Sequence, residues 1–151
     1  MINVLVDSNV AIDFLARRPG FYEDARKLFV FGAMGDYQLW MSSSQLTDLF
    51  YILTEGKAFE RARGKERMRQ LLRFVRVCSI DEGDVVAALD SPWDDFEDAL
   101  VHKAALKMNA SALVTRDEKG FAASFVRTCD AAGFLQWMEG QNGISYAEVE
   151  F

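Results

Sequence analysis

The sequence predicts an α/β protein with a three-layer α/β/α architecture and a central parallel sheet of about four to five strands. Short β-rich runs alternate along the chain with longer segments of helical spacing, which is typical of a parallel sheet covered on both faces. The first run, at residues 2–6, is apolar throughout, as expected of a strand buried on both sides. With 151 residues, 50% of them hydrophobic, the chain suits one domain with its own core.

Five segments have the character of strands. The first has the sequence INVLV and is the most apolar. In chain order, the predicted strands cover residues 2–6, 37–41, 75–80, 112–115 and, more weakly, 124–128. We expect these runs to form the parallel sheet.

Seven segments have helical spacing and lie between or after the predicted strands. In chain order, the predicted helices cover residues 9–16, 22–35, 44–54, 57–74, 81–89, 96–108 and 130–138. Capping residues support several boundaries. Ser8 or Asn9 can cap the first helix and Ser43 or Ser44 the third. Asn109 suits a left-handed C-terminal cap after residue 108.

No linker or repeat divides the chain, so we assign residues 1–140 to one domain. Residues 141–151 show no clear period and are left as a C-terminal tail of unknown structure. No apolar run approaches the roughly 18 residues that a membrane span needs, so we expect a soluble cytoplasmic protein. Cys78 and Cys129 have no partner at zinc spacing and are expected to be reduced thiols.

Four aspartates lie just beyond predicted strands, where α/β proteins hold their ligands. Asp7 and Asp117 each follow a strand, Asp48 lies one turn into the helix after the second strand, and Asp98 lies in the first turn of a later helix. Parallel strands would bring all four to one rim of the sheet. Converging carboxylates repel each other unless cations lie between them, and hard oxygen ligands suit Mg²⁺ or Mn²⁺. The pattern therefore favours phosphate-ester chemistry over zinc hydrolysis.

Each of these residues also has an ordinary structural explanation. Asp7, Asp98 and Asp117 are suited to turns, caps or the start of a helix, and Asp48 could be a solvated helix residue. His102 lies four residues after Asp98 and could share its helix face. We interpret it as a surface or supporting histidine, because the chain has no second histidine to complete a nitrogen-rich site. The joint pattern, and no single residue, carries the hypothesis.

Four ordered segments resemble the successive motifs of the PIN domain, the nuclease fold of VapC-type toxins and of many RNA-processing proteins. They are VLVDSNV at residues 4–10, SSSQLTDLFYIL at 42–53, DFEDAL at 95–100 and VTRD at 114–117. The resemblance runs from Met1 to about Met138, and four motifs in order make it specific.

Carried over residue by residue, the resemblance implies that Asp7, Asp48, Asp98 and Asp117 are the metal-binding acids, and that two polar residues support them. The supporting residues are Asn9 and Thr115. One departure is notable, because many family members have Glu where this chain has Asp48. The shorter side chain makes a water-bridged contact with the metal plausible at that position. The resemblance further implies hydrolysis of single-stranded RNA that leaves a 5′-phosphate.

The basic residues concentrate in one stretch of an acidic protein. The chain has 17 Lys and Arg against 23 Asp and Glu, a formal net charge of −6, which excludes binding of nucleic acid through bulk positive charge. Within residues 57–76, however, eight basic residues against two acidic ones give +6, and the remaining residues carry −12.

This basic stretch offers a surface for RNA or for a protein. An inward stripe at residues 58, 62, 72 and 75 would leave the arginines facing outward. Arg61, Arg67 and Arg73 are then candidates for phosphate contact, since arginine binds phosphate in a bidentate manner. The alternatives are a solvated helix face, or a docking surface for an acidic partner such as the antitoxin that VapC-type relatives pair with.

The residues and the resemblance together predict a Mg²⁺- or Mn²⁺-dependent endoribonuclease acting on single-stranded RNA. The resemblance to VapC-type proteins further suggests the toxin of a toxin–antitoxin pair. An antitoxin protein and a second copy of the chain are the expected protein partners. An aspartyl-phosphate hydrolase with Asp7 as nucleophile fits less well, because such enzymes need a second aspartate where this chain has Asn9. The non-enzymatic alternative is a PIN scaffold that only binds RNA or protein.

Overall fold

A computed structural model describes residues 1–56, 58–143, 145–146 and 149. Its centre is a parallel sheet in the order β3-β2-β1-β4-β5, which confirms the predicted fold class. The strands of this sheet are β1 (Asn3–Val6), β2 (Gln38–Ser42), β3 (Val75–Cys78), β4 (Ala112–Val114) and β5 (Thr128–Cys129).

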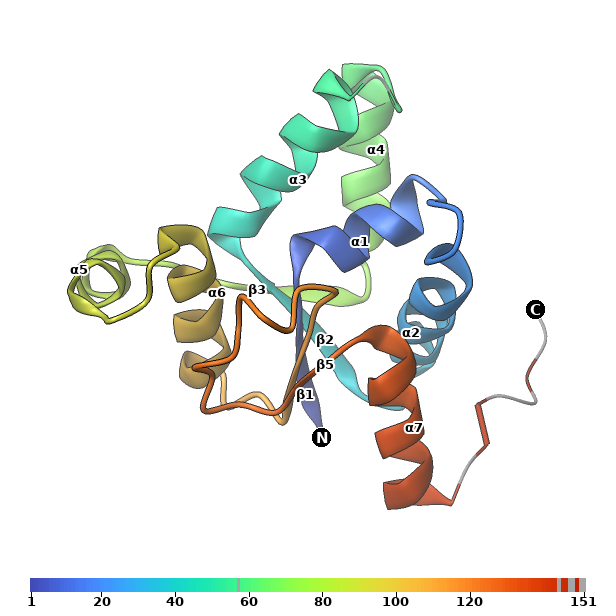
Figure 1. Cartoon of the computed structure of the whole chain (residues 1–151). Helices are drawn as coiled ribbons and strands as arrows, with labels where there is room; N and C mark the ends of the chain where they lie inside the picture. Colours follow the sequence, from blue (N-terminus) through green and yellow to red (C-terminus); the bar gives the residue numbers. More distant parts are fainter. Residues whose placement is uncertain (57, 144, 147–148, 150–151) are drawn as a thin grey trace.

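Helices cover both faces of the sheet (Figure 1). The helices of the described residues are α1 (Ser8–Leu15), α2 (Tyr22–Met34), α3 (Ser43–Glu55), α4 (Arg61–Leu71), α5 (Glu82–Asp90), α6 (Phe96–Lys107) and α7 (Ala131–Asn142). Helices α1, α2 and α7 lie on one face and α6 lies on the other, with α5 packed outside α6. Helices α3 and α4 form a pair that projects beyond the sheet at the end where β1 and β2 lead into helices.

The central strand β1 is buried on both sides, as the apolar run predicted. Val4 and Val6 belong to the larger core with residues of α1, α2, α3 and α7, whereas Leu5 packs into the second core against α6. All three side chains are 0% exposed. In register, Leu5 lies between Trp40 of β2 and Leu113 of β4. The carboxyl ends of β1 and β4 therefore lie side by side, which places the residues after them at one rim.

Two helix caps differ from the expected residues by one position. Asp7, not Ser8 or Asn9, caps α1, and its Oδ1 accepts the N–H of Ser8 at 2.8 Å. Ser42, not Ser43 or Ser44, caps α3 in a reciprocal capping box with Gln45. In both places the strand leads directly into the helix, so the junction residue itself takes the cap position.

Gln45 also ties α3 to the central strand. Its Nε2 donates to the carbonyl oxygen of Val6 at 2.9 Å, so the start of α3 is held against the end of β1. Asn109 has a φ of +54°, which confirms the left-handed position expected after α6.

Helix α4 is shorter than predicted and has a different inward face. Lys57 lies outside the described residues. Phe59 packs against the larger core and donates its N–H to Leu53 O at 3.1 Å, which holds the segment before α4 out of the helix. Gly64 and Leu71 are the buried residues of α4, whereas the expected inward positions 58, 62 and 72 are exposed. Of the predicted stripe, only Val75 is buried.

The fifth strand lies four residues later than its predicted start. The segment at residues 124–127 is a loop in which Ser124 Oγ donates to the carbonyl oxygen of Val126 and accepts its N–H. This local pairing shapes the start of the loop, and the first backbone bond to β4 is made by Arg127, whose carbonyl oxygen accepts the N–H of Leu113 at 2.8 Å. Only Thr128 and Cys129 join the sheet, beside Leu113 and Val114.

The C-terminal segment is attached to the domain in its described part. Helix α7 continues to Asn142, and Gly143, with a φ of +67°, caps it. Tyr146 is 1% exposed, packs on Phe31 and donates its hydroxyl to Asp36 Oδ2 at 3.1 Å. Cys78 and Cys129 are free thiols. None of the described helices has the length and apolar character to cross a bilayer.

Candidate functional site

Three of the four predicted aspartates meet at the rim formed by the ends of β1 and β4. A methyl group placed on Gly120 would collide with Asp117 Oδ2 and would lie 3.1 Å from Asp98 Oδ2, so both carboxylates reach the same small space. The charge of Asp117 acts on Asp7, and the charges of Asp7 and Asp117 both act on Asp98. We call Asp7, Asp98 and Asp117 the acidic cluster.

The fourth aspartate lies at the outer side of the same site. A small cleft of about 120 Å³ is lined by Asp7 and Asp98 together with Asp48 and Glu97. Asp48 is exposed on α3, and its negative charge is the main cause that raises the pKa of Glu97. Asp48 thus faces Glu97 across the cleft, in keeping with the less direct role that its short side chain suggested.

Hydrogen bonds hold Asp7 in place from two directions. Its Oδ1 accepts from Ser8 N, and its Oδ2 accepts the hydroxyl of Thr115 at 2.7 Å. Thr115 is fully buried, and its Oγ1 in turn accepts the N–H of Asp117 at 3.0 Å and the side-chain amide of Asn9 at 3.4 Å. Both residues predicted to support the acids are therefore bonded within the site.

Burial and neighbouring charges raise the pKa values of Asp7 and Asp98. Burial, followed by the charges of Asp95, Asp7, Asp117 and Glu97, raises the pKa of Asp98 to about 6. Burial also raises the pKa of Asp7, although its hydrogen bonds from Thr115 and Ser8 act in the opposite direction. The protein therefore stores like-charge repulsion at this rim, which a bound cation would relieve.

The donor set suits a hard divalent cation. Every candidate ligand is a carboxylate oxygen, which Mg²⁺ and Mn²⁺ prefer, and the acids repel one another. Within the described ranges, no three acidic, histidine or cysteine side chains converge into a complete metal site. Asp7, Asp98 and Asp117 are the residues that would hold a metal.

Two residues of the site were not among the predicted ones. Glu97 stands in the first turn of α6, where a negative charge favours the start of a helix, and it also lines the cleft. Asp95 caps α6 and accepts the N–H of Asp98 at 2.9 Å. Gly120 had no sequence signal beyond being three residues after Asp117.

His102 is a buried structural residue. It is 5% exposed and stacks on Trp93 with ring centroids 4.7 Å apart. Its Nε2 accepts the N–H of Phe125 at 3.2 Å, and burial lowers its pKa. The neutral ring therefore supports the loop between β4 and β5, and it does not lie on the helix surface.

The three predicted arginines of the basic stretch do not share one surface. Arg61 pairs with Glu55 at 3.6 Å and lines a groove between α3 and α4. Arg67 lies on the other side of α4, with its guanidinium 5.8 Å from the centre of the Phe59 ring. Arg73 is exposed after the end of α4. Gly64 does not break the helix, since α4 passes through it and the glycine is buried against Phe50 and Thr54 of α3.

The α3–α4 groove is large and mainly apolar, with a basic rim. Its volume is about 780 Å³. Leu46, Phe50, Tyr51, Met68 and Leu72 provide its apolar lining, and its charged residues are the basic Arg61, Lys65 and Arg69 and the acidic Glu55. Tyr51 is 66% exposed although it borders this groove.

The fold and the acidic cluster define a member of a known class. Residues 3–119 match the family model of the PIN domain, and the chain belongs to the PIN domain family. Among curated proteins, no sequence matches this chain significantly.

Solved structures of PIN toxins share the fold. VapC20 of Mycobacterium tuberculosis, described as a toxin that cleaves the sarcin-ricin loop, is 19% identical with a TM-score of 0.64, and the match covers 82% of this chain and 96% of VapC20. FitAcB from Neisseria gonorrhoeae is 22% identical with a TM-score of 0.62, covering 85% of this chain and 98% of that one. VapBC2 from Rickettsia felis, solved with a DNA fragment from its promoter, is 16% identical with a TM-score of 0.62 over 85% and 98%.

Proposed function

We propose that this PIN domain protein is a Mg²⁺- or Mn²⁺-dependent endoribonuclease that hydrolyses phosphodiester bonds of single-stranded RNA. The observation that carries the proposal is the grouping of acids at the rim of the sheet, where Asp98 and Asp117 meet beside Gly120 and Asp7 lines the same cleft as Asp98. Mutual repulsion of these carboxylates is unfavourable without a cation, and the group matches the oxygen ligands that a phosphate-bridging metal requires.

Different residues of the site would bind the metal, add negative charge and position the acids. Asp7, Asp98 and Asp117 would hold the metal, and Asp48 and Glu97 add negative charge at the outer side of the cleft. When bound, a divalent metal supplies an activated water and offsets charge on the phosphate. Thr115 holds Asp7 Oδ2 and the backbone of Asp117 through one hydroxyl, so that two of the three acids keep a fixed relation.

The aspartyl-phosphate alternative is weakened by the surroundings of Asn9. Its Nδ2 donates to Thr115 Oγ1 and its Oδ1 accepts the N–H of Arg116 at 3.3 Å, so the side chain is committed to the scaffold. An amide also has no proton to give as a general acid.

A role as the toxin of a toxin–antitoxin pair is supported by the relatives and by one surface. Structures similar to this chain include VapBC-1 from nontypeable Haemophilus influenzae and FitAB bound to a DNA fragment. The α3–α4 groove has an apolar floor and a basic rim, which suit an acidic amphipathic segment of an antitoxin. We further propose that the protein works in the cytoplasm and forms a homodimer.

The direct test is cleavage of a fluorescently labelled single-stranded RNA by the purified protein, with Mn²⁺ and with chelator. We expect cleavage that chelator abolishes and that Asp7→Asn reduces at least a hundredfold. Asp90→Asn, which removes one exposed carboxylate at the end of α5, is the matched control and should cleave normally. Cleavage that survives chelation or Asp7→Asn would contradict the proposal, and binding of RNA without cleavage would indicate the scaffold alternative.

A further inference from the structure

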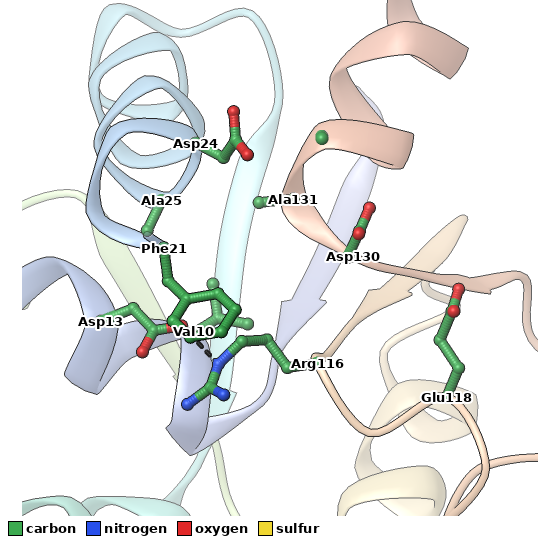
Figure 2. Close-up of a pocket in the computed structure, with 10 residues that line it drawn as sticks. Val10, Asp13, Phe21, Asp24, Ala25, Arg116, Glu118, Asp130 and Ala131 are labelled. Carbon is green, nitrogen blue, oxygen red and sulfur yellow. Dashed lines mark hydrogen bonds and ion pairs between the residues drawn. The ribbon is translucent and has the colours of Figure 1, made fainter. Parts of the chain in front are cut away.

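The side chain of Arg116 leaves the acidic cluster and enters a separate pocket. Arg116 lies between Thr115 and Asp117, yet its guanidinium lies beside Asp13 of α1 and the ring of Phe21, the residue before α2, as Figure 2 shows. The pocket has a volume of about 230 Å³. The Nε of Arg116 donates to Asp13 Oδ2 of α1 at 2.6 Å, and the guanidinium carbon of Arg116 lies 4.2 Å from the centre of the Phe21 ring.

The partner of Arg116 is buried at a cost. The Asp13 side chain is 2% exposed and that of Arg116 is 29% exposed. Within the described part of the chain, the second carboxylate oxygen of Asp13 has no hydrogen-bond partner. Burying a carboxylate with one oxygen unpaired is unfavourable, and apolar residues of similar volume would stabilise such a position as well or better. Stability alone therefore does not account for this ion pair.

The ion pair connects α1 to the segment that carries two functional residues. The backbone N–H of Arg116 donates to Asn9, which also belongs to α1. The side chain of Arg116 adds a second attachment to the same helix one turn later, at Asp13. Arg116 is thus held against α1 by both its backbone and its side chain. Helix α1 itself begins directly after Asp7.

We propose that Arg116 and Asp13 are positioning residues, which hold Asp117 and, through Thr115, Asp7 in the geometry that the acidic cluster needs to bind a divalent cation. The proposal rests on the proposed function for its link to catalysis. It rests on the contacts of α1 with residues 115–117 for its link to the metal.

The experiment compares two double variants that each replace one ion pair with apolar residues. Asp13→Leu with Arg116→Met removes the proposed positioning pair. Asp84→Leu with Lys107→Met removes a comparable pair between α5 and α6, in which Lys107 Nζ lies 2.8 Å from Asp84 Oδ2 and Asp84 is 6% exposed. Mn²⁺ affinity is measured by calorimetric titration of each folded protein, together with its melting temperature.

We expect the positioning variant to bind Mn²⁺ about tenfold more weakly or worse, in line with the roughly 10- to 100-fold losses seen when the residues around metal ligands are changed. The control variant should stay within about twofold of the unmodified protein. Unchanged Mn²⁺ affinity in the positioning variant, or an equal loss in both, would overturn the inference. If the first double variant does not fold, Asp13→Asn keeps the shape of the side chain and carries the same comparison.

Failure of this inference is distinguishable from failure of the proposed function. A protein that binds Mn²⁺ but leaves RNA intact would overturn only the ribonuclease activity, and the Mn²⁺ comparison would still decide the role of Arg116. A protein that binds no Mn²⁺ would overturn both. Arg116→Lys should bind Mn²⁺ more tightly than the double variant does, because lysine keeps the positive charge opposite Asp13 without the guanidinium geometry.

Discussion

The hydroxyl of Thr115 donates a 2.7 Å hydrogen bond to Asp7 Oδ2, across 108 positions of the sequence. The hydroxyl oxygen of Thr115 also accepts the backbone N–H of Asp117 at 3.0 Å. One buried hydroxyl therefore connects the acid after β1 with the acid after β4. It also lowers the pKa of Asp7 against the effect of burial, and so helps to keep that carboxylate ionised.

Replacing this hydroxyl should shift the pH dependence of the proposed reaction. Thr115→Val keeps the shape of the side chain but removes the hydrogen bond to Asp7, so the pKa of Asp7 should rise further. Since metal binding needs the ionised carboxylate, the acidic limb of the rate–pH profile should move to higher pH. Rates measured with Mn²⁺ from pH 5 to 9 test this, with Thr128→Val on β5 as the control. An unmoved acidic limb would show that Thr115 does not set the ionisation of Asp7.

Gly120 should be essential because of the two carboxylates beside it. A methyl group there would displace Asp117 and press on Asp98, while the backbone at Gly120 does not require a positive φ. We therefore expect Gly120→Ala to fold but to bind Mn²⁺ at least about tenfold more weakly, as found when ligand orientation is disturbed. Gly140→Ala in α7 is the matched control, because no atom lies within 4 Å of its added methyl group. Equal Mn²⁺ affinities in the two variants would exclude Gly120 from the site.

The parts of the fold that were predictable are those with a strong local signal. The apolar run of β1 and the alternation of strands and helices sufficed for a parallel sheet, because both follow from burial on two faces. Helix α4 was less predictable. Phe59 lies within the segment predicted as helix, yet it anchors the chain in the core and delays the start of the helix, and Gly64 allows close packing on α3.

The candidate site shows the same division. The four aspartates could be identified because each follows a strand or opens a helix in the right order. The sequence set Asp48 apart from the other acids by its short side chain, but only the structure places it near Glu97 in the cleft. The ion pair of Arg116 with Asp13 was not predictable either, because it depends on how α1 packs against the end of β4.

The basic rim of the α3–α4 groove should contribute little to RNA binding if the groove receives a protein. Arg61→Glu with Arg69→Glu reverses charge at two exposed positions, where substitutions usually change stability by about half a kcal/mol or less each. We expect unchanged affinity for a short single-stranded RNA, measured by fluorescence anisotropy from low to moderate salt. The protein encoded beside this gene is co-expressed and co-purified with each variant. Its loss from the charge-reversed variant would support docking of that protein in the groove.

The same RNA titrations would also reveal binding of RNA by the groove rim. If these arginines touch phosphates, the slope of log affinity against log salt should flatten by about 0.7 for each lost contact. The matched variant, Arg67→Glu with Arg73→Glu, carries the same charge change away from the groove. A flatter slope in the first variant alone would assign the groove rim to RNA.

Removing one charge from the acidic cluster should stabilise the metal-free protein. The pKa of Asp98 is raised from 3.8 to about 6, so between these values the folded protein binds the proton more tightly than the unfolded chain does. Stability of the metal-free protein should therefore fall as pH rises from about 4 to about 6. Asp98→Asn lacks this titration and should melt higher than the unmodified protein in chelator at pH 7, with the difference vanishing below about pH 4.

A bound metal should change the comparison of melting temperatures between Asp98→Asn and the unmodified protein. A cation that binds only the folded state raises the melting temperature, and Asp98→Asn should lose most of this gain in millimolar Mg²⁺ or Mn²⁺. Asp90→Asn should follow the unmodified protein under both conditions, because Asp90 is exposed at the far end of α5. Thermal melts at pH 4 and pH 7, each with chelator and with metal, provide the measurement. If Asp98→Asn melts lower than the unmodified protein in chelator and gains as much from the metal, Asp98 does not belong to the metal site.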